Sequence, residues 1–90
     1  MVKIIEFPKI LDPRGNLTFL QHQDQVPFKI KRTFWTYDVP GGESRGGHAY
    51  RQQEEVIIAL SGSFDVIITN PDGSKKTYQL NRSYYGLYIP

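Results

Sequence analysis

The feature that most constrains the fold is a period-two alternation of side chains, with no segment that keeps a helical period of 3.6 over three turns. Short runs rich in β-branched and aromatic residues alternate with turn formers. The runs that predict strands are residues 2–7, 17–21, 29–39, 47–51, 55–60, 63–69, 75–80 and 84–89. Short strands at this spacing, without helices, predict a β-sandwich or barrel.

Three segments between these runs have the composition of turns or loops. "DPRGN" at 12–16 predicts a tight turn, and "PGGESRGG" at 40–47 predicts a glycine-rich loop. "NPDG" at 70–73 joins two alternating runs, and Pro71 suits the second position of a turn. We therefore expect residues 63–80 to form a hairpin.

Composition narrows the function classes. A chain of 90 residues is expected to form a single domain, and 39% hydrophobic residues exclude a disordered chain. The absence of cysteine excludes disulfides and cysteine metal sites. The 11 basic residues are scattered among 9 acidic ones, which argues against nucleic-acid binding. No leader-like segment or long apolar run is present, so we expect a cytoplasmic protein that does not bind membranes.

The run 29–39 carries apolar side chains on both of its faces. Ile30, Arg32 and Phe34 share one face, and the alternate residues, which include Trp35, share the other. This pattern predicts a strand covered on two sides, with Arg32 pointing into an enclosed space. Because an unpaired buried guanidinium is costly, we expect either an internal carboxylate partner or an anionic ligand.

The stretch "GESRGGHAYRQQEEVIIALSG" has the spacing of the first cupin motif, G-x5-H-x-H-x3–4-E-x6-G. Gly42, His48, Glu55 and Gly62 occupy motif positions, and Tyr50 stands where the second histidine would be. Residues i and i+2 of a strand project to one face, so His48 and Tyr50 are expected to face the barrel interior together. A neutral tyrosine hydroxyl, with a pKa near about 10, is a poor ligand for a divalent metal. The sequence therefore predicts a metal-free site.

Without a metal, His48 and Tyr50 can handle protons. A histidine titrates near neutrality and can act as a general base, while a tyrosine can donate to a developing oxyanion. A lone histidine is more often a structural group bonded to a neighbour. Here the glycine-rich approach, the motif spacing and two nearby arginines, Arg32 and Arg45, favour the functional interpretation. His22 lies outside the motif and is expected at the surface.

The sequence ends in "YYGLYIP", an apolar strand that stops at Pro90. Chain termini are usually polar and frayed. We therefore expect the natural polypeptide to continue, and the β-sandwich or barrel to be incomplete at the C-terminus.

The segments "DPRGNL", "KRTFW", "RGGHAY", "GSFDV" and "GLY" together resemble the dTDP-sugar 3,4-ketoisomerases, which are WxcM-like or FdtA-type cupins. The resemblance covers nearly all 90 residues. It implies an all-β cupin jelly roll and a homodimer in which strands near the N-terminus add to the partner's sheet. It also implies a nucleotide-linked 4-keto-6-deoxyhexose as substrate. The carbonyl group would move from C4 to C3 through an enediol, without a cofactor, in deoxysugar synthesis for surface polysaccharides.

The resemblance also implies roles for individual residues. His48 falls on the family's catalytic histidine pair, and Arg32 on an arginine that contacts substrate inside the barrel. Arg14 and Arg45 are candidate diphosphate or sugar contacts by position. Tyr50 departs from the "HAH" of better-known members, which leaves the identity of the base open. Two other hypotheses stay open: a non-catalytic cupin that binds sugar nucleotides, and a metal-dependent cupin oxygenase or isomerase.

Overall fold

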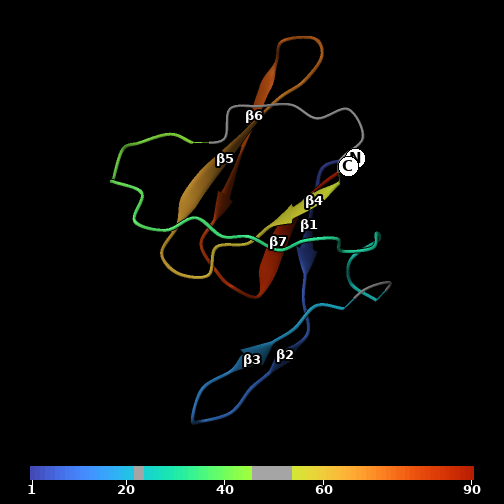
Figure 1. Cartoon of the computed structure of the whole chain (residues 1–90), viewed down its shortest axis with the longest axis vertical. Coiled ribbons are helices and arrows are strands. Elements are labelled where there is room, and N and C mark those ends of the chain that lie inside the picture. Colours follow the sequence, from blue (N-terminus) through green and yellow to red (C-terminus); the bar gives the residue numbers. More distant parts are fainter. Residues whose placement is uncertain (22–23, 46–53) are drawn as a thin grey trace.

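The structure, a computed structural model, describes residues 1–21, 24–45 and 54–90. Across these residues it contains strands and no helix (Figure 1). The strands are β1 (Lys3–Glu6), β2 (Lys9–Ile10), β3 (Leu17–Thr18), β4 (Glu55–Ile57), β5 (Phe64–Thr69), β6 (Lys75–Leu80) and β7 (Tyr85–Ile89).

The central sheet has the strand order β1-β7-β4, and both of its pairs are antiparallel. Leu87 in β7 lies opposite Ile4 of β1 and Ile57 of β4. Opposed residues share a face of the sheet, so these three side chains point the same way. β7, near the end of the chain, therefore lies in one sheet with β1, near its start, and with β4.

The main core lies between this face and the ribbon formed by β5 and β6. Ala59, Leu80 and Leu87 are fully buried and form its centre. Partly buried side chains from both layers pack around them: Val2, Ile57, Val66, Tyr78, Tyr85 and Ile89. The two layers make a small sandwich, as the strand pattern predicts.

The β5–β6 hairpin confirms the prediction for residues 63–80. Val66 lies opposite Tyr78, and Phe64 lies opposite Leu80, so one face of the ribbon meets the core. The turn is closed by the Gly73 amide, which donates to the carbonyl of Asn70 at 2.9 Å. Pro71 therefore occupies the second turn position, where its fixed φ is suitable.

β2 and β3 form a short arm that projects from the rest of the molecule (Figure 1). The predicted turn at 12–16 connects them, and the Gly15 amide donates to the carbonyl of Asp12 at 2.9 Å. Ile10, Leu11 and Leu17 are exposed on this arm. The arm is short because only two residues of each strand pair.

The other strand predictions agree with the structure to different extents. β1, β4, β6 and β7 lie within the predicted runs 2–7, 55–60, 75–80 and 84–89. The run 17–21 contributes only Leu17–Thr18, and β2 was not predicted. The predicted run 47–51 lies outside the described residues.

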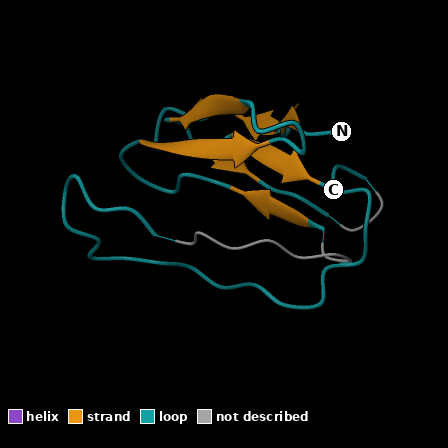
Figure 2. Ribbon diagram, turned by 90° about the horizontal axis from the view of Figure 1, so that it is seen from above, coloured by secondary structure: helices purple, strands orange, loops and turns teal. Residues whose placement is uncertain are grey.

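The predicted strand at 29–39 is wrong. Residues 29–45 contain no strand and are exposed, and they run along one side of the strand layers (Figure 2). A strand requires a neighbour that accepts and donates backbone hydrogen bonds, and no described strand pairs with this segment. Side-chain alternation alone could not reveal that the pairing is absent.

Gly86 allows the central sheet to be covered closely on its second face. A Cβ atom at this position would lie 2.7 Å from Cγ1 of Val56, 3.1 Å from Cγ1 of Ile58 and 3.1 Å from Cζ of Phe7. Glycine in a strand interior commonly marks such a close approach. Phe7 is buried here, so both faces of β7 are packed.

We expect the substitution Gly86→Ala to lower the free energy of unfolding by about 1–3 kcal/mol, because the added methyl group overpacks this contact. Urea denaturation followed by circular dichroism measures the change. Gly41→Ala is the matched control, since a Cβ there meets no atom within 4 Å. Equal stability of the two variants would contradict the packing argument.

Candidate functional site

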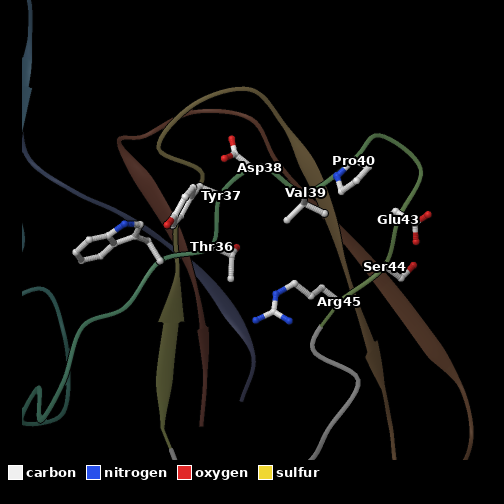
Figure 3. Close-up of a pocket in the computed structure, with 9 residues that line it drawn as sticks. Thr36, Tyr37, Asp38, Val39, Pro40, Glu43, Ser44 and Arg45 are labelled. Atoms are coloured by element: carbon white, nitrogen blue, oxygen red, sulfur yellow. The ribbon is translucent and has the colours of Figure 1, made fainter.

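Residues 35–45 fold around a groove of about 570 Å³ (Figure 3). Its lining comes from residues 35–40 and 43–45. All of these residues are exposed, so the groove is an open depression in the surface and not an enclosed pocket. Trp35, Tyr37 and Val39 supply the apolar groups, and Arg45 supplies a cation.

Two local backbone features fold this segment back on itself. Asp38 has a φ of 57°, a left-handed value that aspartate adopts more readily than most residues. The Glu43 amide donates to the carbonyl of Pro40 at 3.1 Å, which closes a turn. These bends bring Arg45 to the same groove as Thr36 (Figure 3).

Of the three predicted site residues that the structure describes, Arg14, Arg32 and Arg45, only Arg45 lies in the groove. Its guanidinium lies below Thr36 and away from the carboxylates of Asp38 and Glu43 (Figure 3). The ion pairs between described residues are Lys9–Glu6 and Arg14–Asp12, so Arg45 has no carboxylate partner among them. An anionic ligand could bind this guanidinium without first breaking an ion pair.

Arg32 does not occupy the enclosed space that the sequence predicted. It is exposed, and its guanidinium carbon lies 5.0 Å from the centre of the Phe34 ring. The predicted burial of Arg32 is wrong because the segment 29–39 is exposed and does not lie between two layers of strands. Arg32 nevertheless has no carboxylate partner among the described residues.

Arg14 lies at the tip of the arm, outside the groove. Its Nε and Nη2 atoms donate to the two carboxylate oxygens of Asp12 at 3.0 and 2.9 Å. These bonds lower the pKa of Asp12 and raise the pKa of Arg14. Arg14 is therefore already engaged by a carboxylate within its own turn.

The remaining motif residues are only partly described. His48 and Tyr50, and also His22, lie outside the described residues. Glu55 begins β4, is half-buried and shares a face of the sheet with Ile57. Gly62 has a φ of 65°, which accounts for a glycine at the last motif position. The motif thus leads directly into the central sheet.

Sequence reasoning did not find the contact between Tyr88 and Glu54. The Tyr88 hydroxyl donates to Oε2 of Glu54 at 2.7 Å, and this bond, together with desolvation, raises the pKa of Tyr88. The two residues are 34 positions apart, and no motif links them. Sequence periodicity could place Tyr88 on a strand but could not supply its partner.

Among residues 1–21, 24–45 and 54–90, no three His, Cys, Asp or Glu side chains lie together so that they could hold a metal ion. His48 is outside these residues, so the metal-free prediction rests on Tyr50 at the ligand position. The described part of the chain also has no helix with the length and apolar character needed to cross a membrane.

Solved structures of similar proteins share the fold of this chain. QdtA, a sugar 3,4-ketoisomerase from Thermoanaerobacterium thermosaccharolyticum solved with TDP, is 35% identical, with a TM-score of 0.93 over 98% of this chain and 64% of that chain. WlaRB, a TDP-quinovose 3,4-ketoisomerase from Campylobacter jejuni, is 40% identical, with a TM-score of 0.89 over 98% of this chain and 67% of that chain. The predicted all-β cupin jelly roll is thereby confirmed, and the chain forms part of it.

The family model "FdtA: WxcM-like, C-terminal" matches residues 1–90. A relative from Aneurinibacillus thermoaerophilus, TDP-4-oxo-6-deoxy-alpha-D-glucose-3,4-oxoisomerase, is 39% identical over 88 residues. The match covers 97% of this chain and 62% of the relative. The chain therefore belongs to the FdtA family, and it spans about three-fifths of that relative's length.

Proposed function

We propose that the protein is a sugar-nucleotide 3,4-ketoisomerase that moves the keto group of a TDP-linked 4-keto-6-deoxyhexose from C4 to C3. The main support is the 39% identity to an oxoisomerase of this class over nearly the whole chain. The sequence motif that carries His48 and Tyr50 lies within the matched residues. The protein would act in the cytoplasm, and its product would serve deoxysugar synthesis for surface polysaccharides. Recovery of the protein from a periplasmic fraction would contradict that location.

The reaction needs a base near C3 and a proton donor near the C4 oxygen. The base removes the C3 proton, the electrons move toward the C4 oxygen, and protonation of that oxygen gives an enediol. The C3 hydroxyl then loses its proton, C4 gains one, and the ketone forms at C3. His48 is the proposed base and Tyr50 the proposed donor. Substrate and product are isomers, so the proton balance closes.

The groove supports the binding half of this proposal. A guanidinium can hold a diphosphate through two parallel hydrogen bonds. Arg45 has such a group free of carboxylates among the described residues, and the rings of Trp35 and Tyr37 line the same groove. We propose Arg45 and Arg32 as contacts to the sugar nucleotide. Arg14 is a weaker candidate because it is paired with Asp12.

A second function has one observation in its favour. Tyr50 replaces a histidine of the motif, so the protein could bind a sugar nucleotide without isomerising it. Calorimetry showing binding of the TDP-sugar, together with no exchange at C3, would identify this non-catalytic cupin. Stoichiometric iron, nickel or manganese in the purified protein would instead support a metal-dependent enzyme.

We also propose a homodimer in which N-terminal strands add to the partner's sheet. β1 is an edge strand of the central sheet, and the arm beside it exposes Ile10, Leu11 and Leu17 (Figure 1). Edge strands and apolar arms are surfaces that a second chain can cover. This support is structural and independent of the catalytic proposal.

The substitution His48→Asn should abolish incorporation of solvent deuterium at C3 of a TDP-4-keto-6-deoxyhexose, because the proposed base is lost. NMR of the recovered sugar measures the incorporation. His22→Asn, at the other histidine of the chain, should leave the exchange rate unchanged. Unimpaired exchange in the His48→Asn variant would discard His48 as the base.

The substitution Arg45→Lys should weaken TDP binding about tenfold or more, because charge-assisted bonds contribute about 1.5–3 kcal/mol and lysine lacks the two-point geometry. Isothermal titration calorimetry gives the Kd. Arg82→Lys is the control, since Arg82 lies in the loop after β6 and donates to the carbonyl of Asn81 at 3.2 Å. Equal losses in both variants would indicate a general charge effect and not a contact at Arg45.

The substitution Leu11→Glu should shift the protein from dimer to monomer, because it places a charge on the apolar arm. Sedimentation equilibrium measures the mass. Ile67→Glu is the matched control, since Ile67 is 62% exposed on β5 while Leu11 is 74% exposed on the arm. A monomeric wild-type protein, or an unchanged dimer in the Leu11→Glu variant, would refute the arm as the interface.

A further inference from the structure

Asp38 is the one non-glycine residue with a left-handed backbone among residues 1–21, 24–45 and 54–90, with a φ of 57°. The other described residues with a positive φ are glycines. A Cβ atom makes this conformation unfavourable, and aspartate and asparagine tolerate it better than most residues. Residues held in such sparsely populated conformations occur preferentially at ligand sites. The backbone of Asp38 therefore points to a role in the groove that this residue lines.

Asp38 lies at the first of two bends that shape the groove. The chain passes Thr36 and Tyr37, changes direction at Asp38, and returns through a second bend to Arg45 (Figure 3). The second bend is the turn closed by the bond between residues 43 and 40, and Gly42, at its third position, has a φ of 85°. Glycine adopts such a value at little steric cost. The first bend has no glycine, so its geometry depends on Asp38.

The Asp38 carboxylate does not shape the groove by a contact of its own. In Figure 3 it points away from the Arg45 guanidinium. The ion pairs between described residues are those of Lys9 and Arg14, and Asp38 takes part in neither. A carboxylate near a bound diphosphate would also repel it. What Asp38 contributes to the groove is therefore the geometry of its backbone.

We propose that Asp38 is a positioning residue whose left-handed backbone presets the fold of residues 35–45, so that Arg45 and the rings of Trp35 and Tyr37 share one groove before a sugar nucleotide binds. This inference rests on the proposed function. A ligand that binds only one conformation has an apparent Kd equal to its intrinsic Kd divided by the populated fraction of that conformation. A residue that favours the folded-back conformation therefore strengthens binding without touching the nucleotide.

Three substitutions of Asp38 separate the effect of its backbone from that of its side chain. Asp38→Val removes the carboxylate and the tolerance for a left-handed backbone, Asp38→Asn removes only the charge, and Asp38→Gly removes the side chain but adopts the conformation readily. We expect Asp38→Val to weaken TDP binding about tenfold, because the competent conformation becomes less populated. Asp38→Asn and Asp38→Gly should stay within about threefold of wild type. Isothermal titration calorimetry gives the Kd.

Asp65→Val is the matched control for the loss of a charge. Asp65 is an exposed residue of β5 whose backbone is not left-handed, so this variant should bind TDP as the wild-type protein does. Asp38 is exposed and lies outside the strands, so the far-UV circular dichroism spectra of the Asp38 variants should match that of the wild type.

A second measurement requires no ligand. A left-handed residue places its own Hα atom close to its amide proton, which gives a strong nuclear Overhauser effect within the residue. In the free protein, which has a mass of 10.4 kDa, this signal should be strong at position 38 of the wild type and of Asp38→Asn, and weak in Asp38→Val.

The two proposals fail in different ways. A wild-type protein that binds no TDP would refute the proposed function, and the nuclear Overhauser effect would still decide whether the bend at Asp38 is preset. Wild-type affinity in Asp38→Val would overturn the inference and leave the proposed function standing. Equal losses in all three Asp38 variants would also overturn it, because the carboxylate and not the backbone would then be responsible. A weak signal at Asp38 in the free wild-type protein would overturn it as well.

Discussion

The packing of β7 between two layers is the constraint on which the rest of the structure depends. One face of this strand places Leu87 against Leu80 and Ala59, and all three are buried. The other face reaches Phe7 through the missing side chain of Gly86. Because β7 also pairs with β1 and β4, it fixes the start of the chain, the end of the motif and the ribbon relative to each other. The position of Tyr88 follows from the same strand.

The molecule exposes more surface than its mass requires. A compact monomer of this mass would expose about 5,400 Å², whereas this chain exposes 7671 Å². Its radius of gyration is 14.2 Å, compared with about 12 Å for a compact domain of this length. The excess is physically consistent with the unpaired segment 29–45 and the projecting arm, both of which leave apolar side chains exposed. Exposed apolar surface of this kind favours association with a second chain, which supports the proposed homodimer.

Sequence patterns predicted the local features and missed those that depend on a partner. The hairpin at 63–80 could be predicted because turn chemistry and alternation agree within one short segment. The segment 29–39 has an equally clear alternation, but a strand also needs a neighbour, which periodicity does not encode. The arginines were predicted as a group, yet only Arg45 reaches the groove, because side-chain surroundings depend on contacts distant in sequence. For the same reason the bond between Tyr88 and Glu54 could not be predicted from sequence patterns.

The different surroundings of the three arginines decide which of them can best hold a dianionic nucleotide. Arg14 already binds both oxygens of Asp12, so a phosphate there would have to compete with a carboxylate two residues away. Arg32 rests on the Phe34 ring, which leaves its charge without a carboxylate among the described residues. Arg45 combines a guanidinium that pairs with no carboxylate among the described residues with a groove lined by aromatic rings. A free guanidinium gains a full charge-assisted bond, whereas an already paired one gains only the difference. Arg45 is therefore the strongest of the three arginines as a candidate contact for the proposed sugar nucleotide.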